Sequence, residues 1–203
     1  MNKTDASIDL LIQSPTKSFS LHKFKKRSLN WKTFQKLVYQ IIMSMKTMGK
    51  VSGLSKEFLE RIMLAVTSVN ECRYCTYYHT KIALESGCSD DEIRGILGGD
   101  FSCAVQEELP ALAFAQHFAE SHEQPSRKAL KQLVKVYGIE KSQQIITACR
   151  MITMGNLFGN TLDAYIHRYH GISPEDGSPL LEGIVYYIAA IPATKMEKVL
   201  KRN

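Results

Sequence analysis

The sequence predicts an all-α protein, and three observations lead to this prediction. Apolar residues recur three and four positions apart in nearly every segment, which is the spacing of one helix face. No segment of useful length alternates apolar and polar residues, and the chain has no Asn-Gly hairpin signal. Residues that typically begin and end helices stand between the periodic segments.

The first expected helix covers residues 31–45, where the apolar residues form one stripe. The second covers residues 55–66, and Ser55 is its expected N-cap. For the third, Asn70 is the expected N-cap, because its side chain can accept a backbone N–H. That helix is expected to end at Gly87, which suits the left-handed conformation of a helix C-terminus.

The second half of the chain continues this pattern. Ser89 and Glu92 match a capping box at the start of a short helix. Further helices are expected over residues 107–122, 126–138, 140–169 and 179–200. The third of these is long enough for two helices, or for one with a break near Gly155 or Gly159. In the last one, we expect an interruption at Pro192.

Charge divides the chain into unequal parts. Residues 1–50 carry a net charge of +8, whereas the remaining residues carry −2. We therefore predict a basic N-terminal extension with one helix over residues 1–50. A helical core follows over residues 51–175, and a C-terminal helix over residues 176–203 packs on the core or on a neighbouring subunit. Hydrophobic residues make up 44% of the chain, enough to form a real core.

A basic cluster in the extension leaves several partners open. Its members are Lys23, Lys25, Lys26 and Arg27. They can meet phosphate or an anionic membrane surface, or they can form a solvated face or an arm packed on a neighbouring subunit. No nucleic-acid motif accompanies them, so we expect no nucleic acid partner. We expect neither a secretory signal nor a membrane span, and we predict a reducing cytoplasm.

The segment NECRYCTYYHTK, residues 70–81, holds the chemistry-bearing residues. Cys72 and Cys75 are three positions apart, and His79 follows Cys75 by four, so all three can line one side of a helix. Three interpretations remain open: a redox pair, a metal site, or ordinary packing. At the start of a helix Cys72 favours the thiolate, and His79 offers Cys75 a base.

The metal and packing interpretations involve the other cysteines and histidines. A closed zinc site needs four ligands, but the chain has no second C-x-x-C pair. Candidate fourth ligands are His117, His122, His167 and His170. We interpret Cys88, Cys103 and Cys149 as small buried hydrophobic residues.

Glu60 is a possible fourth member of the site. On an unbroken helix it would lie about 18 Å from Cys72. The segment TSVNE, residues 67–71, contains β-branched and capping residues suited to a break. If the chain turns there, the Glu60 carboxylate can meet His79. The alternative is that Glu60 is an ordinary surface acid.

The stretch ERIMLAVTSVNECRYCTYYHTKIALESGCSDDEI resembles the carboxymuconolactone decarboxylase superfamily, specifically its alkylhydroperoxidase D-like (AhpD-like) branch. That branch has a Glu, eleven residues, C-x-x-C, three residues and a His, a pattern that falls here on Glu60, Cys72, Cys75 and His79. The likeness covers roughly residues 50–170. It implies an antiparallel helical bundle that assembles into trimers or hexamers and needs no metal or flavin cofactor.

The resemblance also implies an activity and a role for each residue. The activity is a thiol-dependent reduction of small organic hydroperoxides or protein disulfides, with a thiol reductant as partner. Cys75 attacks the peroxide and becomes a sulfenic acid, and Cys72, more exposed at the helix start, condenses with it. His79, oriented by Glu60, moves the proton off Cys75. Lactone decarboxylation is not expected, since that branch generally lacks the thiol pair.

The local physics and the resemblance disagree on which cysteine reacts, and another function remains possible on the same residues. The helix-start argument favours ionising Cys72, whereas the resemblance assigns the attack to Cys75. Between them stand Arg73, which can stabilise a thiolate or an anionic substrate, and Tyr74. The alternative function is a zinc-stabilised helical binding module whose basic arm engages an acidic partner.

Overall fold

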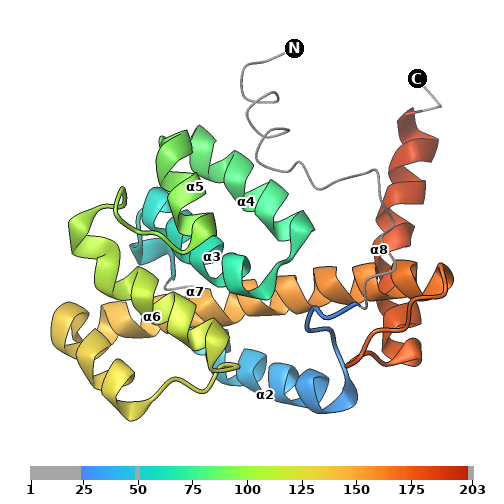
Figure 1. Cartoon of the computed structure of the whole chain (residues 1–203), viewed down its shortest axis with the longest axis horizontal. Helices are drawn as coiled ribbons and strands as arrows, with labels where there is room; N and C mark the ends of the chain where they lie inside the picture. Colours follow the sequence, from blue (N-terminus) through green and yellow to red (C-terminus); the bar gives the residue numbers. More distant parts are fainter. Residues whose placement is uncertain (1–23, 49–50, 201–203) are drawn as a thin grey trace.

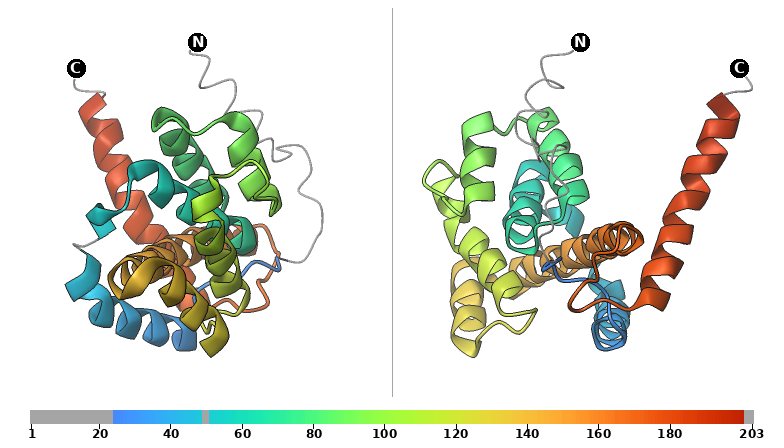
Figure 2. Two further views of the ribbon diagram at one scale, coloured as in Figure 1. Left: turned by 90° about the vertical axis from the view of Figure 1, so that its left-hand side faces the viewer. Right: turned by 45° about the vertical axis from the view of Figure 1, so that its right-hand side comes forward.

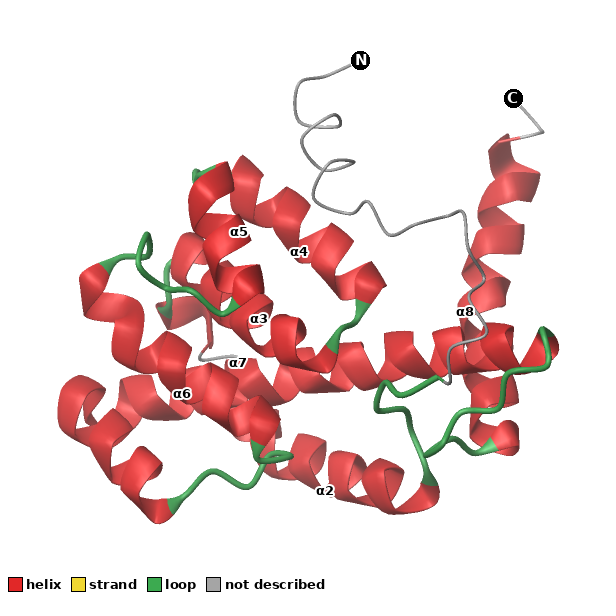
Figure 3. Cartoon of the chain, in the orientation of Figure 1, coloured by secondary structure: helices red, strands yellow, loops and turns green. Residues whose placement is uncertain are grey.

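The computed structural model describes residues 24–48 and 51–200. Every regular element in those ranges is helical (Figure 3), which confirms the predicted all-α class. The α-helices are α2 (Trp31–Met48), α3 (Lys56–Asn70), α4 (Arg73–Glu85), α5 (Asp90–Gly98), α6 (Leu109–Glu120), α7 (Arg127–Tyr169) and α8 (Pro179–Leu200). The single turns Val51–Gly53 and Gln106–Glu108 are 3-10 helices.

The long helix α7 is the element on which the others are arranged. It crosses the molecule in Figure 1, with α3, α4 and α5 on one side and α2 on the other. The main core lies between α3, α5, α6 and α7, where side chains such as Ile62, Ile96, Leu112 and Ile145 are fully buried. A smaller apolar cluster forms where α7 meets α2 and α8.

The hairpin of α3 and α4 follows the sequence prediction closely. Ser55 caps α3, since its side chain accepts the N–H of Phe58. The helix ends at Asn70, and Glu71 adopts the left-handed conformation with φ 54° and ψ 34°. The predicted break over residues 67–71 is therefore confirmed at its last position. Because the chain reverses there, α4 packs back against α3.

In α7 the predicted boundary at Gly138 is confirmed, but the break expected within residues 140–169 is absent. Ser126 caps this 43-residue helix, and the backbone leaves the helical region only at Gly138, with φ 72°. The segment 126–138 thus ends at its glycine as expected. Gly155 and Gly159 instead stay within the helix. The missing side chain of Gly159 provides room for the Cys72 sulfur at the start of α4, so this glycine serves a close approach and not a bend.

The helix α8 packs on the C-terminal part of α7 and then rises away from the other helices, as Figure 2 shows. The predicted interruption at Pro192 was wrong, since the helix runs through that residue. A proline removes one backbone hydrogen bond, and the others of a long helix can remain. None of the helices within the described ranges combines the length and apolarity needed to cross a membrane.

The segment ahead of α2, residues 24–30, lies along α7, and we call it the N-terminal strap. The N–H of Leu29 donates to Thr161 Oγ1 over 2.8 Å, and the Phe24 ring meets the His167 ring edge-on at 5.0 Å. Asn30 and Thr33 cap α2 by reciprocal hydrogen bonds of 2.8 and 2.9 Å. These contacts hold the strap to the body of the same chain.

Two members of the basic cluster form ion pairs within the chain. Lys26 Nζ lies 3.5 Å from Asp163, and Arg27 lies 2.9 Å from Glu123. Lys25 is exposed, and Lys23 lies outside the described residues. Part of the charge that suggested an external partner is therefore balanced by acids of the helical body.

Candidate active site

Glu60 and His79 form the first half of the site. The His79 Nδ1 atom lies 2.7 Å from Glu60 Oε2, and the Glu60 carboxylate is buried. This confirms the predicted contact and excludes the alternative that Glu60 is a surface acid. Position 60 on α3 and position 79 on α4 meet because the two helices form a hairpin. The buried carboxylate fixes the orientation of the imidazole ring.

Cys72 and Cys75 form the second half, at the start of α4. Their Sγ atoms are 2.6 Å apart and share a hydrogen bond. The N-cap of α4 is Cys72 and not Asn70, since the Cys72 sulfur accepts the N–H of Cys75 at 3.3 Å. Asn70 is the last residue of α3, because Glu71 takes up the reversal of the chain.

The expected exposures of the two thiols were the wrong way round. Cys72 has no solvent-exposed surface, whereas Cys75 is partly exposed. The reason is the capping geometry, in which the N-cap side chain folds back over the first turn and faces α7. Cys75 is thus the more accessible thiol of the pair.

The environment separates the acidities of the two thiols. The hydrogen bond between the two sulfurs lowers the pKa of Cys72 below its ordinary value, and the backbone N–H groups of residues 74 and 75 act in the same direction. The same sulfur–sulfur contact, together with burial, raises the pKa of Cys75 well above its ordinary value. The pair therefore favours a single negative charge on Cys72 and a proton on Cys75. This agrees with the helix-start argument from the sequence.

Glycine at position 159 allows the sulfur pair to lie against α7. A Cβ atom added at Gly159 would stand 2.6 Å from the Cys72 sulfur, which is closer than real contacts allow. At Gly155, one turn earlier, an added Cβ would be 3.9 Å from the Cys75 sulfur, an ordinary contact. Gly159 is therefore part of the site, although its sequence position suggested a helix break.

Two buried amides on α7 hold the hairpin in place. The side chain of Asn156 forms hydrogen bonds of 3.0 and 3.1 Å with Thr67 on α3. Asn160 Nδ2 donates to the Asn70 carbonyl over 2.7 Å, at the end of α3. Both amides are fully buried. The paired Gly-Asn steps in GNLFGN were the available sequence signal, because the four-residue spacing places both amides on one face.

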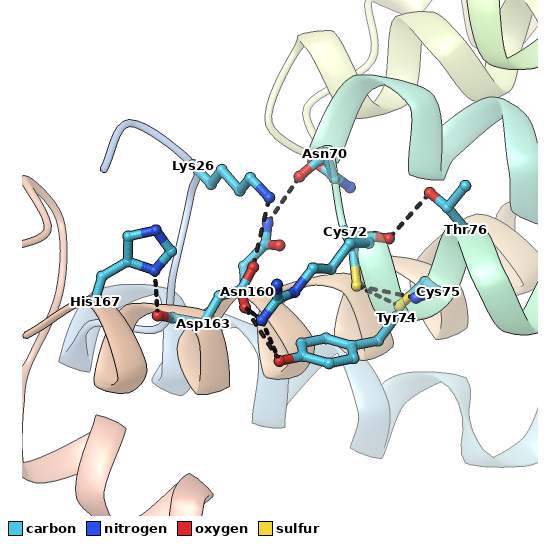
Figure 4. A network of polar contacts seen from close by, with 10 residues as sticks. Lys26, Asn70, Cys72, Tyr74, Cys75, Thr76, Asn160, Asp163 and His167 are labelled. Atoms are coloured by element: carbon cyan, nitrogen blue, oxygen red, sulfur yellow. Dashed lines mark hydrogen bonds and ion pairs between the residues drawn. The ribbon is translucent and has the colours of Figure 1, made fainter. Parts of the chain in front are cut away.

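An ionic network borders the other side of the thiols, as Figure 4 shows. The Asp163 carboxylate is 1% exposed and forms an ion pair with Arg73. It also accepts the Tyr74 hydroxyl at 3.1 Å and lies 3.5 Å from Lys26 Nζ. Arg73 therefore binds an internal acid, which the sequence alone did not suggest. Burial raises the pKa of Tyr74, as does the charge of Asp163.

The remaining cysteines lie outside this arrangement. Cys88 and Cys149 are buried, as expected, and burial raises the pKa of both thiols. Cys103 is exposed, contrary to expectation, because the chain between α5 and α6 is a surface turn there. Within the part of the chain that the structure describes, no three His, Cys, Asp or Glu side chains gather as a metal site would require. The zinc interpretation thus gains no support from the geometry.

A comparison with known protein families finds a match over part of the chain. The sequence model of the carboxymuconolactone decarboxylase family matches residues 36–117. Over that segment the chain is similar to this family. The match begins within α2 and ends within α6, so it includes all four predicted site residues. No curated protein and no solved structure matches the chain significantly.

The family match confirms the resemblance but differs from it in extent. It starts before residue 50, so it includes part of the helix that we had placed in the extension, and it ends well before residue 170. Asn156, Gly159 and Asp163 on α7 lie beyond it, and Lys26 lies ahead of it. The carboxymuconolactone decarboxylase family includes decarboxylases and AhpD-like peroxidases, so the match by itself assigns no reaction to this chain.

Proposed function

We propose that the protein is a thiol-dependent reductase of small organic hydroperoxides or of a partner's disulfide, as the AhpD-like branch implies. The observation that carries this proposal is the position of both pairs on one hairpin. Glu60 holds His79 at 2.7 Å, and the Cys75 sulfur lies 2.6 Å from the Cys72 sulfur, one helical turn before His79. A proton donor and a dithiol are thus supplied by the same short segment.

The first step oxidises Cys75. Its proton passes to the Cys72 sulfur as the Cys75 sulfur bonds to the terminal oxygen of the hydroperoxide. The O–O bond breaks, Cys75 becomes a sulfenic acid, and the alkoxide leaves with a proton supplied by His79. We assign the attack to Cys75 because it is the more accessible thiol, although the surroundings lower the pKa of Cys72.

The second step closes the disulfide. The Cys72 sulfur attacks the Cys75 sulfur, the S–O bond breaks, and the hydroxyl leaves as water with the proton of Cys72. An external dithiol then reduces the disulfide by exchange and returns one proton to the thiol pair and one to His79. The net reaction consumes one hydroperoxide and one dithiol and yields an alcohol, water and a disulfide. A pair in this role must stay reducible, so we propose that it acts in the cytoplasm.

Turnover of an organic hydroperoxide tests this proposal. Wild-type protein with dithiothreitol should consume tert-butyl hydroperoxide, and without reductant it should lose two free thiols per chain. Cys75→Ser should abolish turnover, and Cys72→Ser should accumulate sulfenic acid on Cys75. Cys103→Ser is the matched control and should behave as wild type, since that thiol is exposed and outside the site. Retained turnover in Cys75→Ser would refute the proposal, and sulfenic acid found only on Cys72 would reverse the roles.

We also propose that the protein is a homo-oligomer, a trimer or hexamer, as the resemblance implies. The helices α2 and α8 support this, because both expose large apolar side chains. Among the side chains that the structure describes, examples are Tyr39, Ile42 and Met43 on α2, and Leu180, Tyr187 and Ile188 on α8. Exposed apolar surface of this kind typically marks an interface. Light scattering should give a mass of three or six chains, and a monomer at micromolar concentration would contradict the proposal.

A further inference from the structure

The buried carboxylate of Asp163 links the N-terminal strap to the thiol pair. On α7 it lies one turn after Gly159, against which the Cys72 sulfur packs. Arg73 and Tyr74, which follow Cys72 directly, bind it from α4, and Lys26 reaches it from the strap. Three segments distant in sequence therefore meet at one negative charge beside the thiols (Figure 4).

A buried carboxylate of this kind needs compensating charge. Left unbalanced, it disfavours a second negative charge nearby, and its field raises the pKa of Cys72. Arg73 supplies one cation to the carboxylate, and its guanidinium also lies 4.8 Å from the centre of the Tyr74 ring. Lys26 supplies the second cation, and its side chain is 28% exposed.

We propose that Lys26 and Asp163 are positioning residues that set the reactivity of the Cys72 sulfur, so that the N-terminal strap tunes the thiol pair. The relevance to turnover rests on the proposed function, whereas the effect on the thiol does not. Lys26 lies ahead of the segment that matches the family, and Asp163 lies after it. Both proposed positioning residues therefore lie outside the matched segment.

The strap can keep its place without the Lys26 charge. Leu29 donates to Thr161, Phe24 packs on His167, and Arg27 pairs with Glu123 at 2.9 Å. A neutral residue at position 26 therefore removes a charge and leaves the other anchors. Among the described residues, Cys75 and Asp163 act directly on the charge of Cys72, and Arg73, Tyr74 and Lys26 act on it through Asp163.

The experiment measures alkylation of Cys72 by iodoacetamide as a function of pH in the reduced full-length protein. Trypsin cleaves after Arg73, so Cys72 and Cys75 fall on different peptides and mass spectrometry reads each thiol separately. Lys26→Met should slow alkylation of Cys72 near neutral pH by about two- to fivefold, the range expected for a partly exposed charge pair. The pH midpoint of Cys72 alkylation should be higher in this variant than in the wild-type protein. Lys26→Arg should restore the wild-type profile.

Asp163→Asn should move the pH midpoint in the opposite direction, because it removes the negative charge and leaves both cations. Lys25→Met is the matched control, since it deletes a lysine charge on an exposed neighbouring position of the strap, and its profile should match wild type. If Asp163→Asn fails to fold, Lys26→Glu takes its place and should shift the midpoint further upward than Lys26→Met.

Two outcomes would overturn the proposal. One is a Lys26→Met profile identical to wild type, and the other is a shift of Lys26→Met and Asp163→Asn in the same direction, which a purely structural role predicts. The assay contains no peroxide, so it remains decisive if the wild-type protein reduces none. In that case the proposed function fails, while opposite shifts still support the tuning of Cys72.

Discussion

Two polar clusters flank the thiol pair, and they differ in how the chain assembles them. Glu60 and His79 come from adjacent helices and are 19 positions apart. The Asp163 network brings together the strap, α4 and α7, and its Lys26 contact spans 137 positions. The first cluster joins neighbouring turns of one hairpin, whereas the second requires the whole body to be folded.

The comparison shows why one cluster was predicted and the other was not. The spacing of Cys72, Cys75 and His79 fixes their common helix face, and a reversal at residues 67–71 is enough to bring Glu60 to them. No local spacing connects Lys26 or Asp163 to the thiols. The first cluster supplies proton transfer in the proposed reaction, and the second balances charge beside the sulfur atoms.

The largest expected effect is on the first cluster. His79→Ala should lower hydroperoxide turnover by about 10²- to 10⁴-fold, the range of a lost general acid. Glu60→Gln should lower it less, because the imidazole remains but loses its carboxylate partner. Steady-state kinetics with a fixed dithiol measures both. His122→Gln, an exposed histidine away from the site, serves as control, and activity of His79→Ala within threefold of wild type would remove the cluster from the mechanism.

A substitution on α7 tests the surface on which the cysteine pair rests. Gly159→Ala should destabilise the reduced protein by about 1–3 kcal/mol, because the new methyl group overlaps the Cys72 sulfur. Gly155→Ala is the matched control on the same helix. There the added carbon makes an ordinary contact, and stability should stay equal or rise by up to about 1 kcal/mol. Urea unfolding compares them, and equal stabilities would contradict the close approach.

The pH dependence of stability tests where the charge of the pair lies. The pKa of Cys72 is lowered in the folded state, so the unfolded chain binds more protons between that pKa and the ordinary thiol value. Stability of the reduced protein should therefore rise with pH across that window, by up to about 1.4 kcal/mol per pH unit. This added stability should be lost again as the pH falls through the lowered pKa of Cys72. Above the window the raised pKa of Cys75 acts in the opposite direction.

Cys72→Ser gives the control for this pH effect. Urea unfolding at a series of pH values should show no rise across the window in that variant. A wild-type stability that is flat, or that falls with rising pH below the ordinary thiol pKa, would place the charge elsewhere than on Cys72.

The smallest expected effect is in the second cluster. Tyr74→Phe removes the hydroxyl that bonds to Asp163 and accepts from Arg73. The ion pair of Arg73 with Asp163 remains, so the loss of stability should be about 0.5–1.5 kcal/mol. Tyr78→Phe, at an exposed position of the same helix, should change stability by less. Equal losses in the two variants would show that the hydroxyl of Tyr74 adds nothing to the network.

Much of the fold follows from local signals. Ser55, Ser89 and Ser126 cap their helices because short polar side chains satisfy exposed N–H groups, which a sequence reveals directly. The errors arose where tertiary contact overrides local preference. Gly159 looks like a helix breaker by itself, but a sulfur atom from another helix fills its space.

The same distinction applies to the site. Whether Asn70 or Cys72 caps α4 depends on where the chain reverses after α3. Because the reversal is at Glu71, Cys72 becomes the N-cap and its sulfur is the buried one. Asn156 and Asn160 become site residues only because α7 passes under the hairpin. The division of the chain at residues 50 and 175 and the catalytic roles of Glu60, Cys72, Cys75 and His79 stay predictions.

The single tryptophan of the chain stands where the strap passes into α2. The Trp31 side chain is half exposed and meets the Phe34 ring edge-on at 6.1 Å. Indole fluorescence depends on contact with water, so the emission of Trp31 reports on the junction of the strap and α2 without an added label. Coverage of α2 by another chain should shift its emission to shorter wavelength, and release of the strap should shift it to longer wavelength.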